Sequence, residues 1–218
     1  MQFEHTEVFN IEGALRGMRN PLNSWAKSDS EWEFVEDPSI INPNDEVKFV
    51  IGENDMKLAQ RLILAGSEHR KFMRQIFVST NVTAPLYFFK QFDTYHVGVT
   101  TNSTSTMHKL ASTPITMECF ELGNQKLPLY PEAWDNLIKQ LETLRLMYNK
   151  TKDKAYWYEL IRMLPESWLQ TRTVTMSYEN IRNMYFQRRN HKLTEWSKSF
   201  IEWVDSLPYA NELIKLEA

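Results

Sequence analysis

Apolar residues recur at helical spacing over much of the second half of the chain. In the stretch YPEAWDNLIKQLETLRLMYNK (residues 130–150), one helical face would carry Trp134, Leu137, Ile138, Leu141, Leu144 and Met147. Such a stripe predicts an amphipathic helix with one buried face. Further helices are predicted at about residues 154–163, where Leu164-Pro165 ends the helix, at 178–189, at 194–206, and in a short segment from Tyr209.

One helix is expected in the first half of the chain. Asn54 or Asp55 can cap it, it would run to about Ala65, and Gly66 would stop it. Leu58, Leu62 and Ala65 would then share one face. By contrast, residues 20–46 are rich in Asn, Asp, Ser and Pro, which predicts loop or irregular structure.

Two segments have the pattern of strands. Ile76, Val78, Thr80 and Val82 alternate with Phe77, Ser79 and Asn81, and LQTRTVTM (residues 169–176) is rich in β-branched residues. After the first strand, Ala84-Pro85 indicates a helix start, because proline is tolerated in the first turn. The expected order there is strand, aromatic helix from about Leu86, then a polar loop.

The fold class follows from this order. Strands are few and flank helical blocks, which favours an α+β fold. No repeat or domain boundary is visible, so one domain over residues 1–218 is expected.

Composition narrows the function classes. At 42% hydrophobic and 24% charged residues, the chain is typical of a soluble globular protein. A net charge of −3 argues against a nucleic-acid partner held by bulk electrostatics. No apolar run approaches a membrane span and the N-terminus is not typical of a signal peptide, so no membrane partner and a cytoplasmic location are expected.

Several site types are disfavoured by spacing. The single cysteine, Cys119, excludes an internal disulfide and a cysteine-based zinc site. The five histidines lack metal-binding spacing, so no metal site is predicted. There is no dinucleotide-binding glycine motif, no phosphate-binding P-loop and no serine nucleophile elbow.

The most unusual stretch is residues 100–106, seven small polar residues between His96 and His108. Its hydroxyl and backbone N–H groups could hold a phosphate, with charge from His108 and Lys109. A solvated linker is the alternative. Two basic clusters have similar alternatives: Arg188-Arg189 is either favourable charge at a helix end or an anion clamp, and Arg70, Lys71 and Arg74 form either a solvated turn or a ligand contact.

The order of strand, Ala-Pro pair, aromatic helix and His-containing polar loop resembles the flavin-dependent thymidylate synthases. Their signature is R-H-R-x-x-S-x-N-E-x-S-x-R-Y. Aligned from Tyr95, it matches His96, Asn102 and Ser105, and Thr100 replaces a serine. The preceding VTAPLYFFKQF, which includes Gln91, is similar to the family's strand-to-helix segment.

The C-terminal half extends the resemblance. RMLPESWLQTRTVTM is similar to the family's R-x-x-L-P followed by a strand, and the segment from Glu179 to Ile214 is similar to its closing helices. Asn183 and Arg188 fall where the family has an asparagine and a nucleotide-binding arginine, and Arg189 could take the latter place. The resemblance covers the chain from about Ala14 to its end.

This resemblance implies an α+β subunit with a mixed or antiparallel sheet, in a homotetramer that binds FAD and dUMP. NADPH would reduce the flavin, and the reduced flavin would pass a hydride to the pyrimidine. Methylenetetrahydrofolate would supply the methylene group, so that dUMP becomes dTMP. The implied catalytic residues are His96 and Gln91, and the implied cofactor-binding residues are His96, Arg74 and Asn183. The implied nucleotide-binding residues are Asn102, Ser103, Thr104, Ser105, Thr106, Arg162, Arg188 and Arg189.

The sequence also departs from the signature. Tyr95 and Val97 replace the two arginines of R-H-R, and Met107 replaces the later arginine. Neither Tyr nor Val can copy the forked, charged hydrogen bonds of arginine. Two hypotheses therefore stay open: a flavin-dependent enzyme acting on dUMP or a related pyrimidine nucleotide, or a homologue that binds a nucleotide or phosphate and has lost flavin chemistry. A structural or interaction protein is a third.

Overall fold

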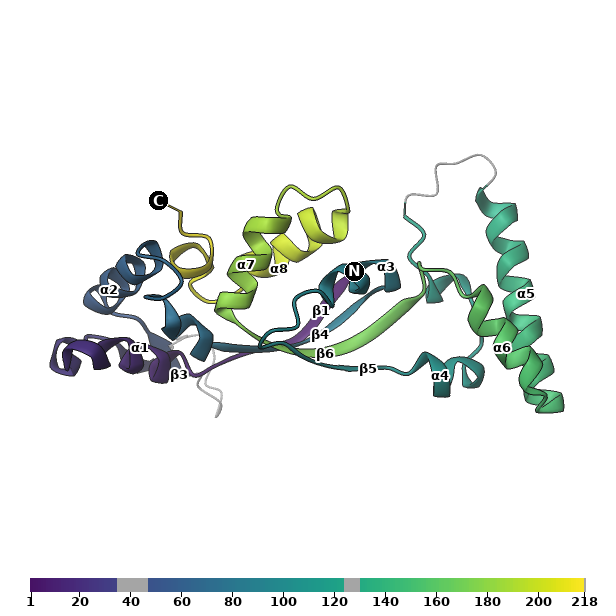
Figure 1. The fold of residues 1–218 in the computed structure, drawn as a ribbon, viewed down its shortest axis with the longest axis horizontal. Coiled ribbons are helices and arrows are strands. Elements are labelled where there is room, and N and C mark those ends of the chain that lie inside the picture. Colours follow the sequence, from purple (N-terminus) through teal and green to yellow (C-terminus); the bar gives the residue numbers. More distant parts are fainter. Residues whose placement is uncertain (35–46, 124–129, 218) are drawn as a thin grey trace. The chain divides into compact units, whose positions relative to one another are not determined.

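The computed structural model describes residues 1–34, 47–123 and 130–217. The chain forms two compact units, called here unit 1 (Met1–His5 and Thr80–Val174) and unit 2 (Thr6–Ser79 and Thr175–Ala218). The elements of the first half are β1 (Gln2–Phe9), α1 (Ile11–Arg19), β2 (Glu31–Phe34), β3 (Val47–Val50), α2 (Glu53–Leu64), β4 (Phe77–Pro85) and α3 (Leu86–Phe92) (Figure 1). Those of the second half are β5 (Thr100–Ser103), α4 (Thr106–Lys109), α5 (Tyr130–Thr151), α6 (Lys154–Met163), β6 (Leu169–Ser177), α7 (Tyr178–Arg188) and α8 (Ile201–Asp205).

The main sheet has the strand order β1-β4-β6-β5. β4 and β6 run antiparallel: Leu86 donates to Trp168 at one end, and Tyr178 donates to Ile76 at the other. In β4 the alternate residues Val78, Thr80, Val82 and Ala84 are buried, as the sequence pattern predicts. With its helices, this antiparallel sheet gives the expected α+β fold.

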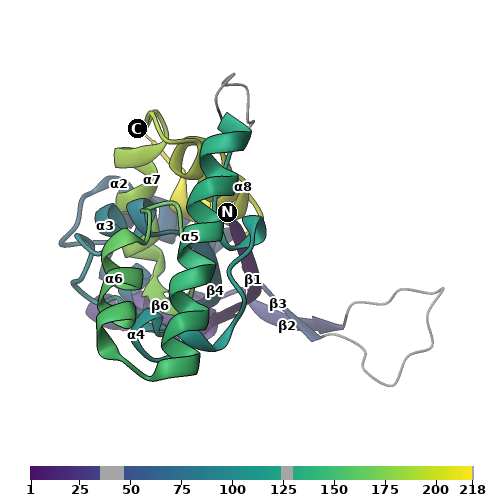
Figure 2. The ribbon, with the colours of Figure 1, turned by 90° about the vertical axis from the view of Figure 1, so that its right-hand side faces the viewer.

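The helices of unit 1 include a hairpin of α5 and α6, which run side by side in opposite directions (Figure 2). Leu141 and Leu160 are fully buried between the helices and pack with Leu110, Ile115 and Phe120. Trp134, Leu137, Ile138 and Leu144 of the predicted stripe surround this cluster, which confirms the amphipathic prediction. α3 starts directly after Pro85, and its Phe88, Phe89 and Phe92 are buried as core residues.

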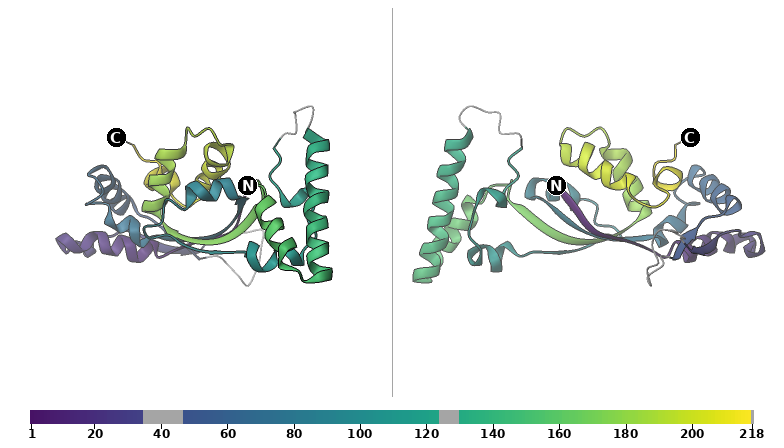
Figure 3. Two further views of the ribbon diagram at one scale, coloured as in Figure 1. Left: turned by 45° about the vertical axis from the view of Figure 1, so that its right-hand side comes forward. Right: turned by 180° about the vertical axis from the view of Figure 1, so that it is seen from behind.

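Unit 2 carries the C-terminal helices. α7 starts with a capping box: the Ser177 hydroxyl accepts from the Asn180 N–H, and the Asn180 side chain accepts from the Ser177 N–H. The chain then passes through a π-helical segment, η6 (Glu195–Phe200), into α8, which packs against α7 (Figure 3). Trp196, Phe200 and Val204 are fully buried there.

Several elements differ from the sequence expectations. Residues 31–34 form strand β2, paired antiparallel with β3, within the stretch expected to be irregular. The Trp32 and Phe49 rings meet edge to face across this pair, with their centroids 5.2 Å apart. Residues 35–46 of that stretch lie outside the described residues. Residues 100–103 form strand β5 instead of a loop, because they lie at the edge of the sheet beside β6.

Helix α2 has nearly the predicted bounds but a different buried face. Asp55, Ala59 and Ile63 are buried, whereas Leu58 and Leu62 are partly exposed. Gly52 is the cap, so Asp55 lies inside the first turn. The stop at Gly66 is as expected, since this residue has φ of 111°.

Candidate functional site

The polar stretch spans an edge strand and the start of a helix. Asn102 and Ser103 are exposed on β5, and Thr104 is fixed to β6: its N–H donates to the Thr171 carbonyl at 2.9 Å. Ser105 caps α4, because its hydroxyl accepts from the His108 N–H at 3.1 Å. Thr106 begins that helix. The stretch thus presents its hydroxyls in a defined geometry instead of forming a flexible linker.

Gln91 and His96 lie at the end of α3 and just beyond it. The Gln91 side-chain oxygen Oε1 is shielded from solvent and has no hydrogen-bond partner among the described residues. Burying an acceptor without a donor costs free energy. His96 is exposed, in the turn that leads from α3 to β5.

An arginine that sequence reasoning missed lies beside this stretch. The Arg172 guanidinium on β6 stacks on the Phe89 ring at 3.9 Å and donates to Asp93 at 2.6 Å. Its Nε–H also donates to the side-chain oxygen of Gln170, whose amide group donates to the Thr104 carbonyl. The sequence signal was present: Gln170 and Arg172 continue the alternate positions that Val174 and Met176 occupy on the buried face of β6.

The remaining unit 1 candidate, Arg162, lies on α6. Its side chain is 70% exposed, 3.4 Å from the Glu159 carboxylate and over the Tyr158 ring. Its described contacts are with residues of its own helix.

Four candidates lie in unit 2. Arg74 is exposed on the 3₁₀ turn η3 (Lys71–Gln75), and Asn183 is exposed on α7. Arg188 lies over the Trp196 ring, and Arg189 pairs with Glu217. The two arginines thus take part in packing and ion pairing at the end of α7.

The basic turn of residues 70–74 is less exposed to solvent than the prediction of a solvated turn implies. Arg70 pairs with Glu179 on α7 at 2.8 Å, and both side chains are largely buried. Lys71 pairs with Glu68 on the surface. Arg70 is therefore committed to holding η3 against α7.

Unit 2 contains a cleft of about 850 Å³ that the sequence did not predict. α1, α2 and η3 line it, with Met18, Leu58, Leu62 and Phe72 among its apolar residues. Its cationic residues include Lys27 and Arg61, which form no ion pair with described residues. The partly exposed leucines of α2 are thus explained, because they line a cavity instead of the core.

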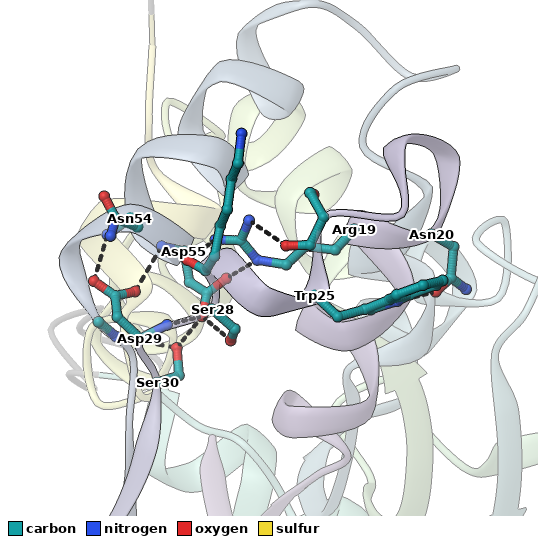
Figure 4. Close-up of polar contacts among 11 residues, drawn as sticks. Arg19, Asn20, Trp25, Ser28, Asp29, Ser30, Asn54 and Asp55 are labelled. Atoms are coloured by element: carbon teal, nitrogen blue, oxygen red, sulfur yellow. Dashed lines mark hydrogen bonds and ion pairs between the residues drawn. The ribbon is translucent and has the colours of Figure 1, made fainter.

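A buried polar network supports one wall of this cleft (Figure 4). The Arg19 guanidinium pairs with the fully buried Asp55 carboxylate and donates to the carbonyls of Ser24 and Lys27. Ser28 and Ser30 donate to the other Asp55 oxygen, both at 2.6 Å. The network therefore ties α1 and the segment after it to α2.

Asp29 completes the network from outside the helix. Its carboxylate accepts from the backbone N–H groups of Asn54 and Asp55, which no helical carbonyl can satisfy. Burial raises the pKa of the Asp55 carboxyl, but hydrogen bonds from Ser28, Ser30 and Arg19, together with the Arg19 charge, outweigh burial and leave the pKa below its ordinary value.

Two further features of the described residues bear on the site. No group of three or more His, Cys, Asp or Glu residues among them could hold a metal ion. No helix in the described ranges is long and apolar enough to cross a membrane.

Comparison with known proteins shows similarity in structure alone. No protein-family model matches the chain. No curated protein matches it in sequence. Among solved structures, the chain is similar to the flavin-dependent thymidylate synthase ThyX from Helicobacter pylori complexed with FAD and dUMP, with a TM-score of 0.69 and 13% identity over 99% of this chain and 98% of that one.

A second structure of the Helicobacter pylori enzyme with FAD and dUMP gives a TM-score of 0.68 and 14% identity, over the same shares of both chains. At this identity the likeness establishes the fold. The chain therefore has the fold of the flavin-dependent thymidylate synthases, as the order of its sequence motifs predicted.

Proposed function

We propose that this chain is a flavin-dependent enzyme of the thymidylate synthase type, which methylates dUMP to dTMP or modifies a related pyrimidine nucleotide. Methylenetetrahydrofolate and NADPH are the proposed co-substrates. The observation that carries the proposal is the likeness over 99% of the chain to structures that hold FAD and dUMP. Three features of this chain's own residues support it.

The first feature is the unsatisfied acceptor of Gln91. Its Oε1 is buried without a donor, and a ring N–H of a pyrimidine or flavin would supply one. The residue thus fits an N–H-bearing ring at the end of α3. His96, exposed after the same helix, is proposed to contact the reacting rings.

The second feature is the hydroxyl-rich segment of residues 102–106. Asn102, Ser103 and Thr104 are exposed on or next to β5, and Ser105 and Thr106 are only partly covered. Hydroxyl and amide groups hold a phosphate by hydrogen bonds without full charge neutralisation. We propose that they bind the nucleotide phosphate, with Arg162, Arg188 and Arg189 as the arginines that contact the nucleotide.

The third feature is the unit 2 cleft. Its volume of about 850 Å³ lies in the range of cofactor sites. Lys71, Phe72 and Gln75 of η3 line it. Arg74, one of the two unit 2 residues proposed for FAD, lies on the same turn but is not among the lining residues. Bound and reduced, FAD would supply the hydride; the protein's residues orient the rings and exclude water. Asn183 is the other unit 2 residue in this proposal.

The proposed assembly is a homotetramer of single-domain subunits in the cytoplasm. Light scattering on purified protein measures its mass. A mass near that of one 25.9 kDa chain would contradict this part of the proposal.

Colour and turnover test the enzyme directly. Protein purified with its flavin should be yellow, and dUMP, methylenetetrahydrofolate and NADPH together should give dTMP with NADPH consumption. Each omission should abolish dTMP. Deoxyuridine, which lacks the phosphate, is the matched control and should bind more weakly than dUMP. No dTMP from flavin-loaded protein would overturn the enzymatic proposal.

A second candidate function is a nucleotide- or phosphate-binding protein without flavin chemistry. The observation that favours it is the replacement of the signature arginines by Tyr95, Val97 and Met107, of which Val97 is 77% exposed. A colourless protein that binds dUMP but not FAD would support this alternative.

A further inference from the structure

The buried face of β6 ends in two polar residues where packing alone would favour apolar ones. Gln170 is 8% exposed and the Arg172 side chain 13%. A buried amide and a buried guanidinium are costly unless their hydrogen bonds are made. Their partners therefore indicate what the two residues do.

Arg172 fixes which way the Gln170 amide points. A guanidinium has only donors, so the atom of Gln170 that lies 2.9 Å from the Arg172 Nε must be the oxygen. The NH₂ end is then directed to the Thr104 carbonyl, 2.8 Å away. Arginine is thus the reason that Gln170 can hold Thr104.

Thr104 is held from two sides as a result. Gln170 holds its carbonyl, and its own N–H donates to the Thr171 carbonyl. The next residue, Ser105, uses its hydroxyl to cap α4. The position of Thr104 therefore sets where the exposed hydroxyls of this segment lie.

Arg172 is in turn anchored to the segment after α3. Asp93 accepts from it at 2.6 Å, and the Phe89 ring lies under the guanidinium. Asp93 stands three residues before His96. The chain Asp93–Arg172–Gln170–Thr104 thus connects the Gln91–His96 stretch with the polar stretch, and both belong to unit 1.

We propose that Asp93, Arg172 and Gln170 are positioning residues, which hold Thr104 and Ser105 in the geometry that binds the phosphate of the nucleotide. The ligand part of this inference rests on the proposed function. The positioning part concerns the free protein and is tested without any ligand.

The test variant is Gln170→Glu, which keeps the size of the side chain and an acceptor for Arg172 but loses the N–H groups. Its carboxylate would face the Thr104 carbonyl without a donor. In free protein, peptides covering residues 101–109 should exchange amide hydrogen roughly three- to tenfold faster, as expected for the loss of one hydrogen bond. Asp93→Asn should give a smaller change in the same peptides, because Asp93 is half exposed.

Thr173→Val is the matched control. Thr173 lies on the same strand as Gln170 and Arg172 but at an alternate position, on the other face of the strand. Its hydroxyl donates to the Asn81 side chain on β4 at 2.7 Å. This variant loses one interstrand hydrogen bond without touching the chain of contacts. Exchange in residues 101–109 should equal that of the wild type.

Binding gives the second measurement. Gln170→Glu should lower the affinity for dUMP about tenfold and leave the affinity for deoxyuridine unchanged, since only dUMP carries the phosphate. Unchanged exchange at residues 101–109, or a uniform increase over all peptides, would overturn the positioning role. If wild-type protein does not bind dUMP, the proposed function fails, while the exchange result still decides the positioning role.

Discussion

At the scale of single residues, Asp55 shows how the charge of a buried carboxylate is compensated. Its side chain is fully buried, and its negative charge is balanced by Arg19 and by hydrogen bonds from Ser28 and Ser30. Removing one partner of a buried pair leaves an uncompensated charge, which is far costlier than losing a surface pair.

The change Asp55→Asn should therefore lower the free energy of unfolding by roughly 3 kcal/mol or more. Because the folded-state pKa of Asp55 lies below its ordinary value of 3.8, its stabilisation is present above that value and is lost as the pH falls through the folded-state pKa. The difference between wild type and variant should thus shrink below about pH 4. Urea unfolding from pH 7 to pH 3 measures it.

The control is Asp205→Asn, in the exposed pair with Lys215. It should cost under about 1 kcal/mol. Equal losses for both substitutions at pH 7 would contradict a special role for the buried pair.

Gln91 illustrates the opposite situation, a polar atom that costs stability in the free protein. Gln91→Leu removes a buried acceptor that has no donor among the described residues. Without ligand, the free energy of unfolding should be unchanged or slightly higher, by no more than about 1 kcal/mol. Thermal unfolding measures it. Titration with dUMP and FAD should show weaker binding of at least one of them. A variant that is markedly destabilised and binds both normally would show that Gln91 serves the fold.

At the scale of elements, the sequence predicted those whose pattern is set by burial. The stripe of α5 and the alternation in β4 reflect faces that the structure buries. β1 and β5 are different: nine of the twelve residues of QFEHTEVF and TTNS are polar, and the residues of β5 are all exposed. Backbone pairing with neighbouring strands holds them, and such pairing leaves no mark on hydrophobic periodicity.

The sequence likewise predicted one part of the candidate site and missed another. The signature resemblance singled out residues 100–106, but its interpretation as a loop missed the edge strand. Gln170 and Arg172 were missed because their partners, Thr104 and Asp93, lie 66 and 79 residues away in sequence. Only the tertiary fold brings these pairs together. The polar positions within a buried strand face were the available signal.

The start of α2 gives a prediction that separates two reasons for a glycine. At Gly52, with φ of −69°, an added Cβ would clash with the Asp29 carbonyl oxygen. At Gly66, with φ of +111°, nothing lies within 4 Å. Gly52→Ala should therefore displace Asp29 from the helix start and cost about 2–3 kcal/mol, whereas Gly66→Ala should cost about 1 kcal/mol from backbone strain alone.

Unfolding in urea measures both costs, and hydrogen exchange in the first turn of α2 localises them. The N–H groups of Asn54 and Asp55 donate to the Asp29 carboxylate. Their exchange rates should rise only in Gly52→Ala. Equal behaviour of the two variants would show that Asp29 does not hold this helix.

At the scale of the whole molecule, the question is whether a chain of negative net charge can bind an anionic nucleotide. Its net charge is −3, and several arginines near the candidate positions are already paired: Arg172 with Asp93, Arg70 with Glu179 and Arg189 with Glu217. We therefore expect the hydroxyl-rich segment of residues 102–106 to hold the phosphate mainly by hydrogen bonds.

Ligand-induced stabilisation tests this at the level of the complete protein. A ligand that binds only the folded state at about 100 times its dissociation constant adds about 2.7 kcal/mol, which for a chain of this length raises the melting temperature by about 5–10 °C. We expect such shifts with dUMP and with FAD, and a smaller one with deoxyuridine. Because hydrogen bonds between partly covered groups are screened less than exposed charges, the dUMP shift should change little between low and physiological salt. A dUMP shift that vanishes with added salt would indicate exposed cations such as Lys109 as the main contact, and a shift with dUMP but not FAD would favour the binding protein over the enzyme.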